Sequence, residues 1–261
     1  MLSGKVARGL VLTTFLHCTA AMLSLVGSAP AEAACNAGPA AAVDWSGCDK
    51  ARLVLRGIDL SGGKFGKTFF TSSDLRGTNL KGADLLRSEL SMASLAGADL
   101  TGANMEKAMA SRTDFSAAKM AKVRLVAAEF SRSNFTKADL QGAYFEDSEM
   151  NRSLFTNANL TNADMSKAEF ARAAFTDAKL AGVKFRYTNL SRANLINVAA
   201  GDADFTGAYM FLTRIGGADL SASTGLTAEQ LQTACGTPET KLPAGLSAPS
   251  TWPCPPDDDD N

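Results

Sequence analysis

The stretch SNFTKADLQGAYF (Ser133–Phe145) places a large apolar residue at every fifth position, namely Phe135, Leu140 and Phe145. A β-strand has a period of two, so a step of five turns the side chain to the opposite face. An α-helix rotates by about 100° per residue, so a step of five rotates it by roughly 140°. Neither element gathers these three side chains into one core. The sequence therefore predicts a backbone with a period of its own.

The same register extends over most of the chain. From Leu55 to Leu220, 34 successive positions at multiples of five are Leu, Phe, Met or Ile, with Ala110 and Ala200 as the exceptions. The position two residues before each of these centres is always Gly, Ala, Ser, Thr or Val from Gly63 onward. Asp and Asn are frequent one residue before the centre. Self-similarity of this length indicates a solenoid.

A chain that bends by about 90° every five residues satisfies this pattern, because four bends close a square coil of about 20 residues. The central residue and its small partner then point inward. Glycines recur at the corners, as in Gly57 and Gly62, where turns need unusual dihedral angles. Successive coils would stack as parallel β-bridges about 4.8 Å apart, so that about 8.5 coils give an all-β rod roughly 40 Å long.

These repeats resemble the pentapeptide-repeat family, whose signature is A(D/N)LXX. The chain contains GADLL, GADLT, GANME, KADLQ, NANLT, NADMS, RANLI and GADLS, within a match of about 166 of 261 residues. The resemblance implies a right-handed quadrilateral parallel β-helix. It also brings in DNA mimicry, the best-known activity of family members that bind gyrase. Residues 55–220 contain 21 Lys and Arg against 18 Asp and Glu, a net charge of +3, whereas a DNA mimic should be strongly negative.

The first 33 residues read as a signal peptide. Lys5 and Arg8 precede a long apolar stretch, and Ala31-Glu32-Ala33 offers a small-x-small cleavage site. An uncleaved membrane anchor and a lipoprotein signal ending at Cys35 are the alternatives. We expect a mature protein that is periplasmic or secreted, monomeric, and outside the membrane once the signal is removed.

Export changes how the cysteines are interpreted. In an oxidising compartment an even number of cysteines indicates disulfides, and local pairing is the simplest of the three pairings open to the last four. Zinc is disfavoured because no Cys-x-x-Cys is present and His17, the one histidine, lies in the signal. The cysteines are Cys18 in the signal, and Cys35, Cys48, Cys235 and Cys254 after it.

We expect caps at both ends of the rod. The predicted segments are the signal peptide 1–33, an N-terminal cap 34–54, the repeat helix 55–220, a C-terminal cap 221–256 and a disordered acidic tail 257–261. Trp45 should plug the N-terminal end of the axis. Near the C-terminus, Thr227 and Gln230 form a capping-box pattern for a short helix that Gly236 would stop, and this helix should cover Phe211 and Leu212.

The sequence offers no catalytic motif and predicts neither enzyme activity, nor a metal, nor a cofactor. The segment after the signal has no histidine, and it lacks a phosphate loop, Gly-x-Ser-x-Gly and HExxH. The gaps left in the core by Ala110 and Ala200 are expected to be filled by neighbouring side chains, with a small ligand pocket as the alternative. The candidate filling residues are Met109, Met120, Val198 and Met210.

A column of arginines is the main candidate site. Positions 20 apart should stack, so five arginines form a ladder with roughly 4.8 Å between neighbours. Acidic residues stand three positions before three of them, at Glu129, Glu149 and Glu169, and Asp114 lies close to the first. Either these groups form a structural lattice of salt bridges, or the ladder docks an anionic partner. The ladder consists of Arg112, Arg132, Arg152, Arg172 and Arg192.

Since Asn189 replaces the acid in the last repeat, Arg192 should be the most available of the five. The functional hypothesis is a non-enzymatic exported rod that acts structurally in the cell envelope or binds a partner. That partner would be a protein or an anionic envelope polymer, and not a nucleic acid. The alternative is a DNA-mimicking inhibitor or protector of a topoisomerase such as gyrase.

Overall fold

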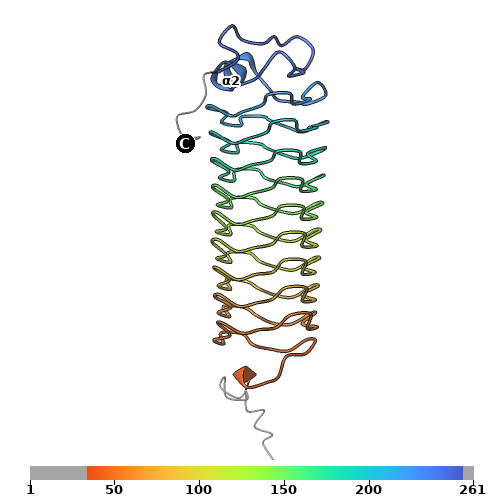
Figure 1. Cartoon of the computed structure of the whole chain (residues 1–261), viewed down its shortest axis with the longest axis vertical. Helices are drawn as coiled ribbons and strands as arrows, with labels where there is room; N and C mark the ends of the chain where they lie inside the picture. The colour runs from red at the N-terminus through yellow and green to blue at the C-terminus, as the bar shows by residue number, and fades with distance from the viewer. Residues whose placement is uncertain (1–33, 255–261) are drawn as a thin grey trace, which may run out of the picture.

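The computed structural model describes residues 34–254, which form a long rod of stacked coils (Figure 1). The N-terminal coils lie at one end of the rod, and the short helix α2 lies at the other. The predicted signal peptide and the acidic tail 257–261 lie outside the described residues, as do the last two residues of the predicted C-terminal cap.

Isolated parallel β-bridges hold the coils together, and they set the register. The first joins Asp44 to Lys64, and bridges between residues 20 apart follow at every fifth position up to Asp204 and Thr224. Each bridge is one residue wide, so residues 34–254 contain bridge residues and not extended strands. Four bridges and four turns per 20 residues make each coil four-sided. The bridges begin at Asp44 and reach Lys241, so regular pairing extends beyond the expected limits 55 and 220 on both sides.

The interior contains the two inward-pointing positions predicted for each repeat. Leu140 and its small partner Ala138 are buried, and the same holds for the central residues from Leu55 to Leu220. Ala110 and Ala200 are fully buried as well. Met109, however, is 40% exposed, so the expectation that it fills the gap beside Ala110 is wrong. Its position, one residue before a centre, is a bridge position on the outer wall.

The backbone hydrogen bonds explain why the coil repeats every five residues. In the pentapeptide 80–84, the N–H groups of Leu80 and Gly82 donate to carbonyls of the following coil. The N–H of Asp84 donates to the preceding coil, and that of Ala83 donates back across the turn to Leu80 at 3.0 Å. Four of five N–H groups are thus satisfied by main-chain carbonyls, as buried donors require.

The bridge residue satisfies the fifth N–H, which belongs to the residue just after the centre. The Asn79 side-chain oxygen accepts from the N–H of Lys81 at 3.2 Å, and that of Asp99 accepts from Thr101 at 3.0 Å. Asn79 also donates to the Asp59 carboxylate one coil below, at 2.8 Å. These side-chain turns give a physical reason for the frequent Asp and Asn before each centre.

The corners need a left-handed residue two positions after the centre. Gly57 and Gly62 adopt this conformation with φ of 66° and 62°, as predicted. Most corners, however, place another residue there, and 24 residues other than glycine have positive φ. Each such residue carries a conformational cost that glycine would not.

Trp45 closes the interior at the N-terminal end. Its side chain is buried against Phe65 and Phe70, with ring centroids 5.8 and 6.4 Å away. The indole N–H donates to the Ala37 carbonyl at 3.0 Å, and the Lys50 ammonium lies 4.0 Å from the ring centroid. A disulfide between Cys35 and Cys48 joins this segment to the first coil.

Helix α2 (Ala228–Thr233) covers the other end (Figure 1). The capping box is present: the Thr227 hydroxyl accepts from the Gln230 N–H, and the Gln230 side chain accepts from the Thr227 N–H. The helix ends at the C-cap Ala234, so the prediction that Gly236 stops it is wrong. Its one buried residue, Leu231, packs into the core.

The segment after α2 folds back onto it. Trp252 donates its indole N–H to the Ala234 carbonyl at 2.7 Å, and a disulfide joins Cys235 to Cys254. Gly236 is required for this packing, because a Cβ there would lie 2.2 Å from the Trp252 ring. The absence of a side chain at Gly236 therefore permits close approach of Trp252 and does not end a helix.

Candidate interaction surface

Aromatic stacking fills the axis in the middle of the rod. Phe115, Phe135, Phe155 and Phe175 are 20 residues apart, and successive ring centroids lie 4.8 to 5.0 Å apart with nearly parallel planes. Within residues 34–254 no group of His, Cys, Asp or Glu side chains is arranged to hold a metal ion. Recognition by this rod must therefore use its outer wall.

The arginine ladder occupies one corner of that wall, in five consecutive coils. All five residues lie two positions after a centre and have φ between 56° and 63°, so each is the left-handed residue of its turn. Four are exposed and one is half-buried. The half-buried one is Arg192, so the expectation that it is the most available of the five is wrong.

The predicted salt-bridge lattice does not form along the lower ladder. Within the described part of the chain, the guanidinium groups of Arg112, Arg132 and Arg152 make neither a hydrogen bond nor an ion pair, so Glu129 and Glu149 do not pair with them. Each glutamate is a bridge residue in the middle of a face, whereas each arginine lies beyond the turn.

The other two expected acids have different partners. The Asp114 carboxylate accepts from the Ser116 N–H at 3.0 Å and from the Asn134 amide at 3.1 Å. Glu169 accepts from the Asn189 amide at 2.6 Å. Bridge-position acids are thus used along their own columns and in their own turns.

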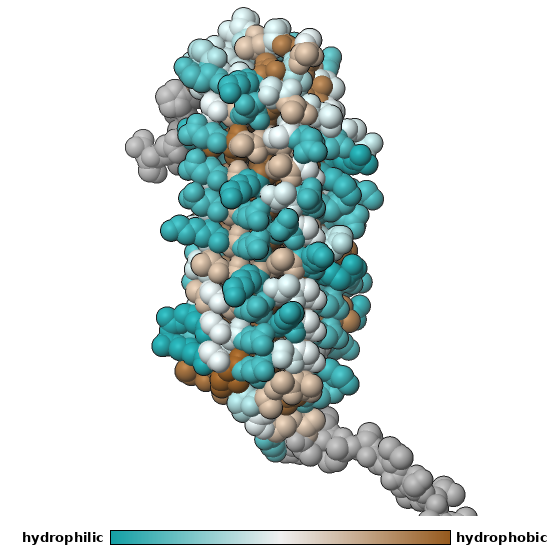
Figure 2. All heavy atoms as spheres, turned by 90° about the vertical axis from the view of Figure 1, so that its right-hand side faces the viewer, coloured by the Kyte–Doolittle hydropathy of each residue, from teal (hydrophilic) through white to brown (hydrophobic). Residues whose placement is uncertain are grey.

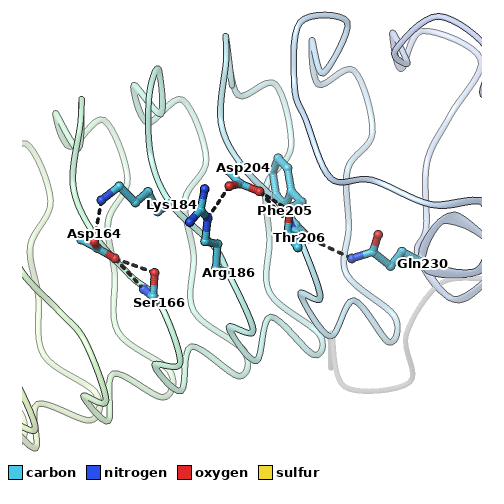
Figure 3. Close-up of polar contacts among 8 residues, drawn as sticks. All are labelled: Asp164, Ser166, Lys184, Arg186, Asp204, Phe205, Thr206 and Gln230. Carbon is cyan, nitrogen blue, oxygen red and sulfur yellow. Dashed lines mark hydrogen bonds and ion pairs between the residues drawn. The ribbon is translucent and has the colours of Figure 1, made fainter.

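Ion pairs form elsewhere on the wall, between adjacent coils of a different face (Figure 3). Lys184 donates to Asp164 at 2.9 Å, and Arg186 donates to Asp204 at 2.5 Å. Burial raises the pKa of Asp164, but hydrogen bonds from the Ser166 hydroxyl and from Lys184 outweigh it, so this pKa lies below its usual value. These carboxylates are therefore ionised and structurally engaged at neutral pH.

The same face connects with the C-terminal cap. Burial raises the pKa of Asp204, but the hydrogen bond from the Thr206 hydroxyl and the interaction with Arg186 lower it further, giving a net decrease. Next to Thr206, the Phe205 carbonyl accepts from the Gln230 amide of α2 at 2.9 Å (Figure 3). The acids of this face thus belong to a network that holds coils and cap together, and they are not arranged as a catalytic pair.

Exposed apolar side chains flank the arginine ladder. In Figure 2, hydrophilic side chains cover most of the visible wall and apolar groups appear in small separate patches. Phe69, Met109 and Tyr209 belong to the bridge column beside the ladder, and each is at least 40% exposed. Tyr209 stacks on exposed Phe211, with ring centroids 6.3 Å apart. Sequence reasoning missed this column, although its register position already indicates an outward direction.

Comparison with protein families agrees with this geometry. The family model of pentapeptide repeats matches eight copies, over residues 54–91, 88–125, 113–152, 153–190 and 188–224. The chain belongs to the pentapeptide-repeat family. The proteins of this family form right-handed quadrilateral β-helices, and the four-sided coils described above have the same arrangement. No curated protein sequence matches the chain.

Among solved structures, this pentapeptide-repeat protein is similar to QnrB1, a plasmid-mediated fluoroquinolone resistance protein, in a trypsin-treated variant. The identity is 18%, the match covers 75% of this chain and 92% of the other, and the TM-score is 0.50. HetL, involved in heterocyst differentiation regulation in Nostoc sp. strain PCC 7120, is 23% identical over 75% of this chain and 91% of its own, with a TM-score of 0.37. Such similarity shows the fold alone. No helix within residues 34–254 has the length and apolarity needed to span a membrane.

Proposed function

We propose that this pentapeptide-repeat protein is a non-enzymatic, exported rod that binds an anionic partner in the cell envelope through its arginine ladder. The observation that carries the proposal is the set Arg112, Arg132 and Arg152. They are exposed in three consecutive coils and have no acidic partner in the described part of the chain.

The ladder is a poor choice if stability is the only requirement. Its positions are left-handed, and glycine or asparagine would fit them at lower conformational cost. Neighbouring arginines also stack at about the coil spacing of 4.8 Å. That is shorter than the screening length of about 8 Å at physiological ionic strength, so the charges repel each other. An external anion would offset both costs, which favours a docking surface over a structural lattice.

Export rests on the N-terminus and on the disulfides. The stretch before Ala34 has the order of a signal peptide, and the structure contains the Cys35–Cys48 and Cys235–Cys254 disulfides. Disulfides persist in the periplasm and outside the cell and are rare in the cytosol. DNA mimicry of a gyrase ligand is less well supported, because the repeat region carries a small positive net charge.

The test is capture of binding partners from the native envelope with the mature protein as bait. A variant with Arg112, Arg132 and Arg152 changed to Gln should remain folded and lose capture. The control changes Lys67, Lys107 and Lys167 to Gln, since these have the same corner position in another column.

Capture by the wild type should weaken steeply between low and high salt, because exposed charge contacts are screened. Equal capture by the arginine variant and the wild type would reject the ladder as a binding site. Loss of capture in both variants would mean that overall charge, and not the ladder, is recognised. Digestion of the captured material with protease distinguishes an acidic protein from an anionic polymer.

A further inference from the structure

The chain leaves the described structure beside the C-terminal end of the arginine ladder. Cys254 is tied by its disulfide to Cys235, with 5.3 Å between the Cα atoms. Cys235 is itself fixed to the last coil, because it forms a parallel bridge with Arg214 and its N–H donates to the Thr213 carbonyl at 2.8 Å. The start of the tail 255–261 is therefore anchored at a known height on the rod.

The bridges below Cys235 give the height of each arginine. Arg214 bridges to Asn194, and Asn194 bridges to Ala174, so these residues descend one coil at a time. Arg192 and Arg172 stand two residues before Asn194 and Ala174, at the adjoining corner. With about 4.8 Å per coil, the three arginines lie roughly 5, 10 and 14 Å below Cys235.

The length of the tail matches these heights. Pro255 and Pro256 form a stiff spacer of about 3.1 Å per residue. Four aspartates follow, Asp257–Asp260. An extended chain of about 3.3 Å per residue puts these carboxylates roughly 10 to 20 Å from Cys254. The aspartates can therefore reach the levels of Arg214, Arg192 and Arg172 without any change in the rod.

We propose that the acidic tail Asp257–Asp260 docks along the C-terminal end of the ladder, on Arg172, Arg192 and Arg214 of its own chain. Charge complementarity favours this occupant: four carboxylates meet three guanidinium groups, while the bridge column between them carries neutral Asn194 and Ala174. The tether keeps the local concentration of carboxylates high, so individually weak pairs are sufficient.

Such docking would divide the ladder in two. The tail covers the C-terminal arginines and leaves Arg112, Arg132 and Arg152 for other anions, so it limits the length of any ligand that binds there. The contact is internal to the chain and does not depend on the partner proposed above. Its failure and the failure of the proposed function are therefore separate results.

NMR spectroscopy of the mature protein with ¹⁵N-labelled aspartate tests the proposal. At low salt the amides of Asp257–Asp260 should show restricted fast motion and shifts away from random-coil values, and about 0.5 M salt should abolish both. Changing Arg172 and Arg192 to Gln should release the tail in the same way while the other aspartate signals stay in place.

Changing Lys107 and Lys167 to Gln is the matched control, because it removes the same charge from the same corner position of another column. This control should leave the tail signals unchanged. Random-coil tail signals in the wild type at low salt would overturn the proposal, as would equal release by the control variant. Tail signals that depend on protein concentration would also overturn it, since docking would then be between chains.

Discussion

Exchanging glycine and alanine within one corner column isolates the cost of the left-handed turn. Gly97 and Ala117 are 20 residues apart at the same corner, with φ of 67° and 54°, and both are exposed. A Cβ on Gly97 would meet no atom within 4 Å, so any effect of a methyl group there is conformational. The left-handed conformation costs a non-glycine residue about 1–2 kcal/mol.

Glycine also gives the unfolded chain more freedom, which opposes this gain by about 0.4–1 kcal/mol. We therefore expect Ala117→Gly to raise the free energy of unfolding by about 0.5–1 kcal/mol, and Gly97→Ala to lower it by a similar amount. The control Ala118→Gly removes a buried methyl group at an inward position and should destabilise. The measurement is denaturant-induced unfolding followed by circular dichroism. A stability of Ala117→Gly at or below that of the wild type would refute the reasoning.

Four other predictions use the same measurements or simple ones. Leu140→Asp should cost more than about 4 kcal/mol because it buries a charge, whereas Lys137→Asp on the wall should be nearly neutral; similar melting temperatures would contradict the inward register. Gly236→Ala should loosen the C-terminal cap, seen as faster proteolysis near α2, because its Cβ meets an indole ring at 2.2 Å. Asp164→Asn should destabilise at pH 7 and lose this effect as the pH falls below about 3.8, since the lowered pKa of Asp164 stabilises the fold only while the group is ionised; an equal difference at pH 7 and pH 3 would contradict this. N-terminal sequencing of exported protein should begin near Ala34, and a chain that retains its N-terminal methionine would argue against a cleaved signal.

The register of the rod could be predicted because one period decides it. Each multiple of five from Leu55 to Leu220 is inward, and the small residue two positions earlier is inward as well, as Ala138 beside Leu140 illustrates. Misplacing Met109 in the core was an error that the same register could have prevented, since bridge positions face outward.

Other features depend on where side chains and turns point, and spacing does not contain this information. The repeat shows that Glu129 and Arg132 stack in parallel columns, but not that the turn between them keeps their charged groups apart. Gly236 fits the pattern of a helix stop equally well, and only the packing of Trp252 shows its actual role. The hydrogen bonds from Asp and Asn to the turns were likewise beyond reach, because they depend on backbone geometry within one pentapeptide.

The direction of the hydrogen bonds limits how anything can attach to this rod. The bridges run from coil to coil along the axis, so the only edges at which a foreign strand could extend the pairing are the first and last coils, where Trp45 and α2 lie. A ligand on the long walls cannot gain affinity by adding a strand, as many peptide-binding domains allow. Selectivity along the walls must then be determined by side chains alone, so substitutions at exposed positions can change the partner while the scaffold stays the same.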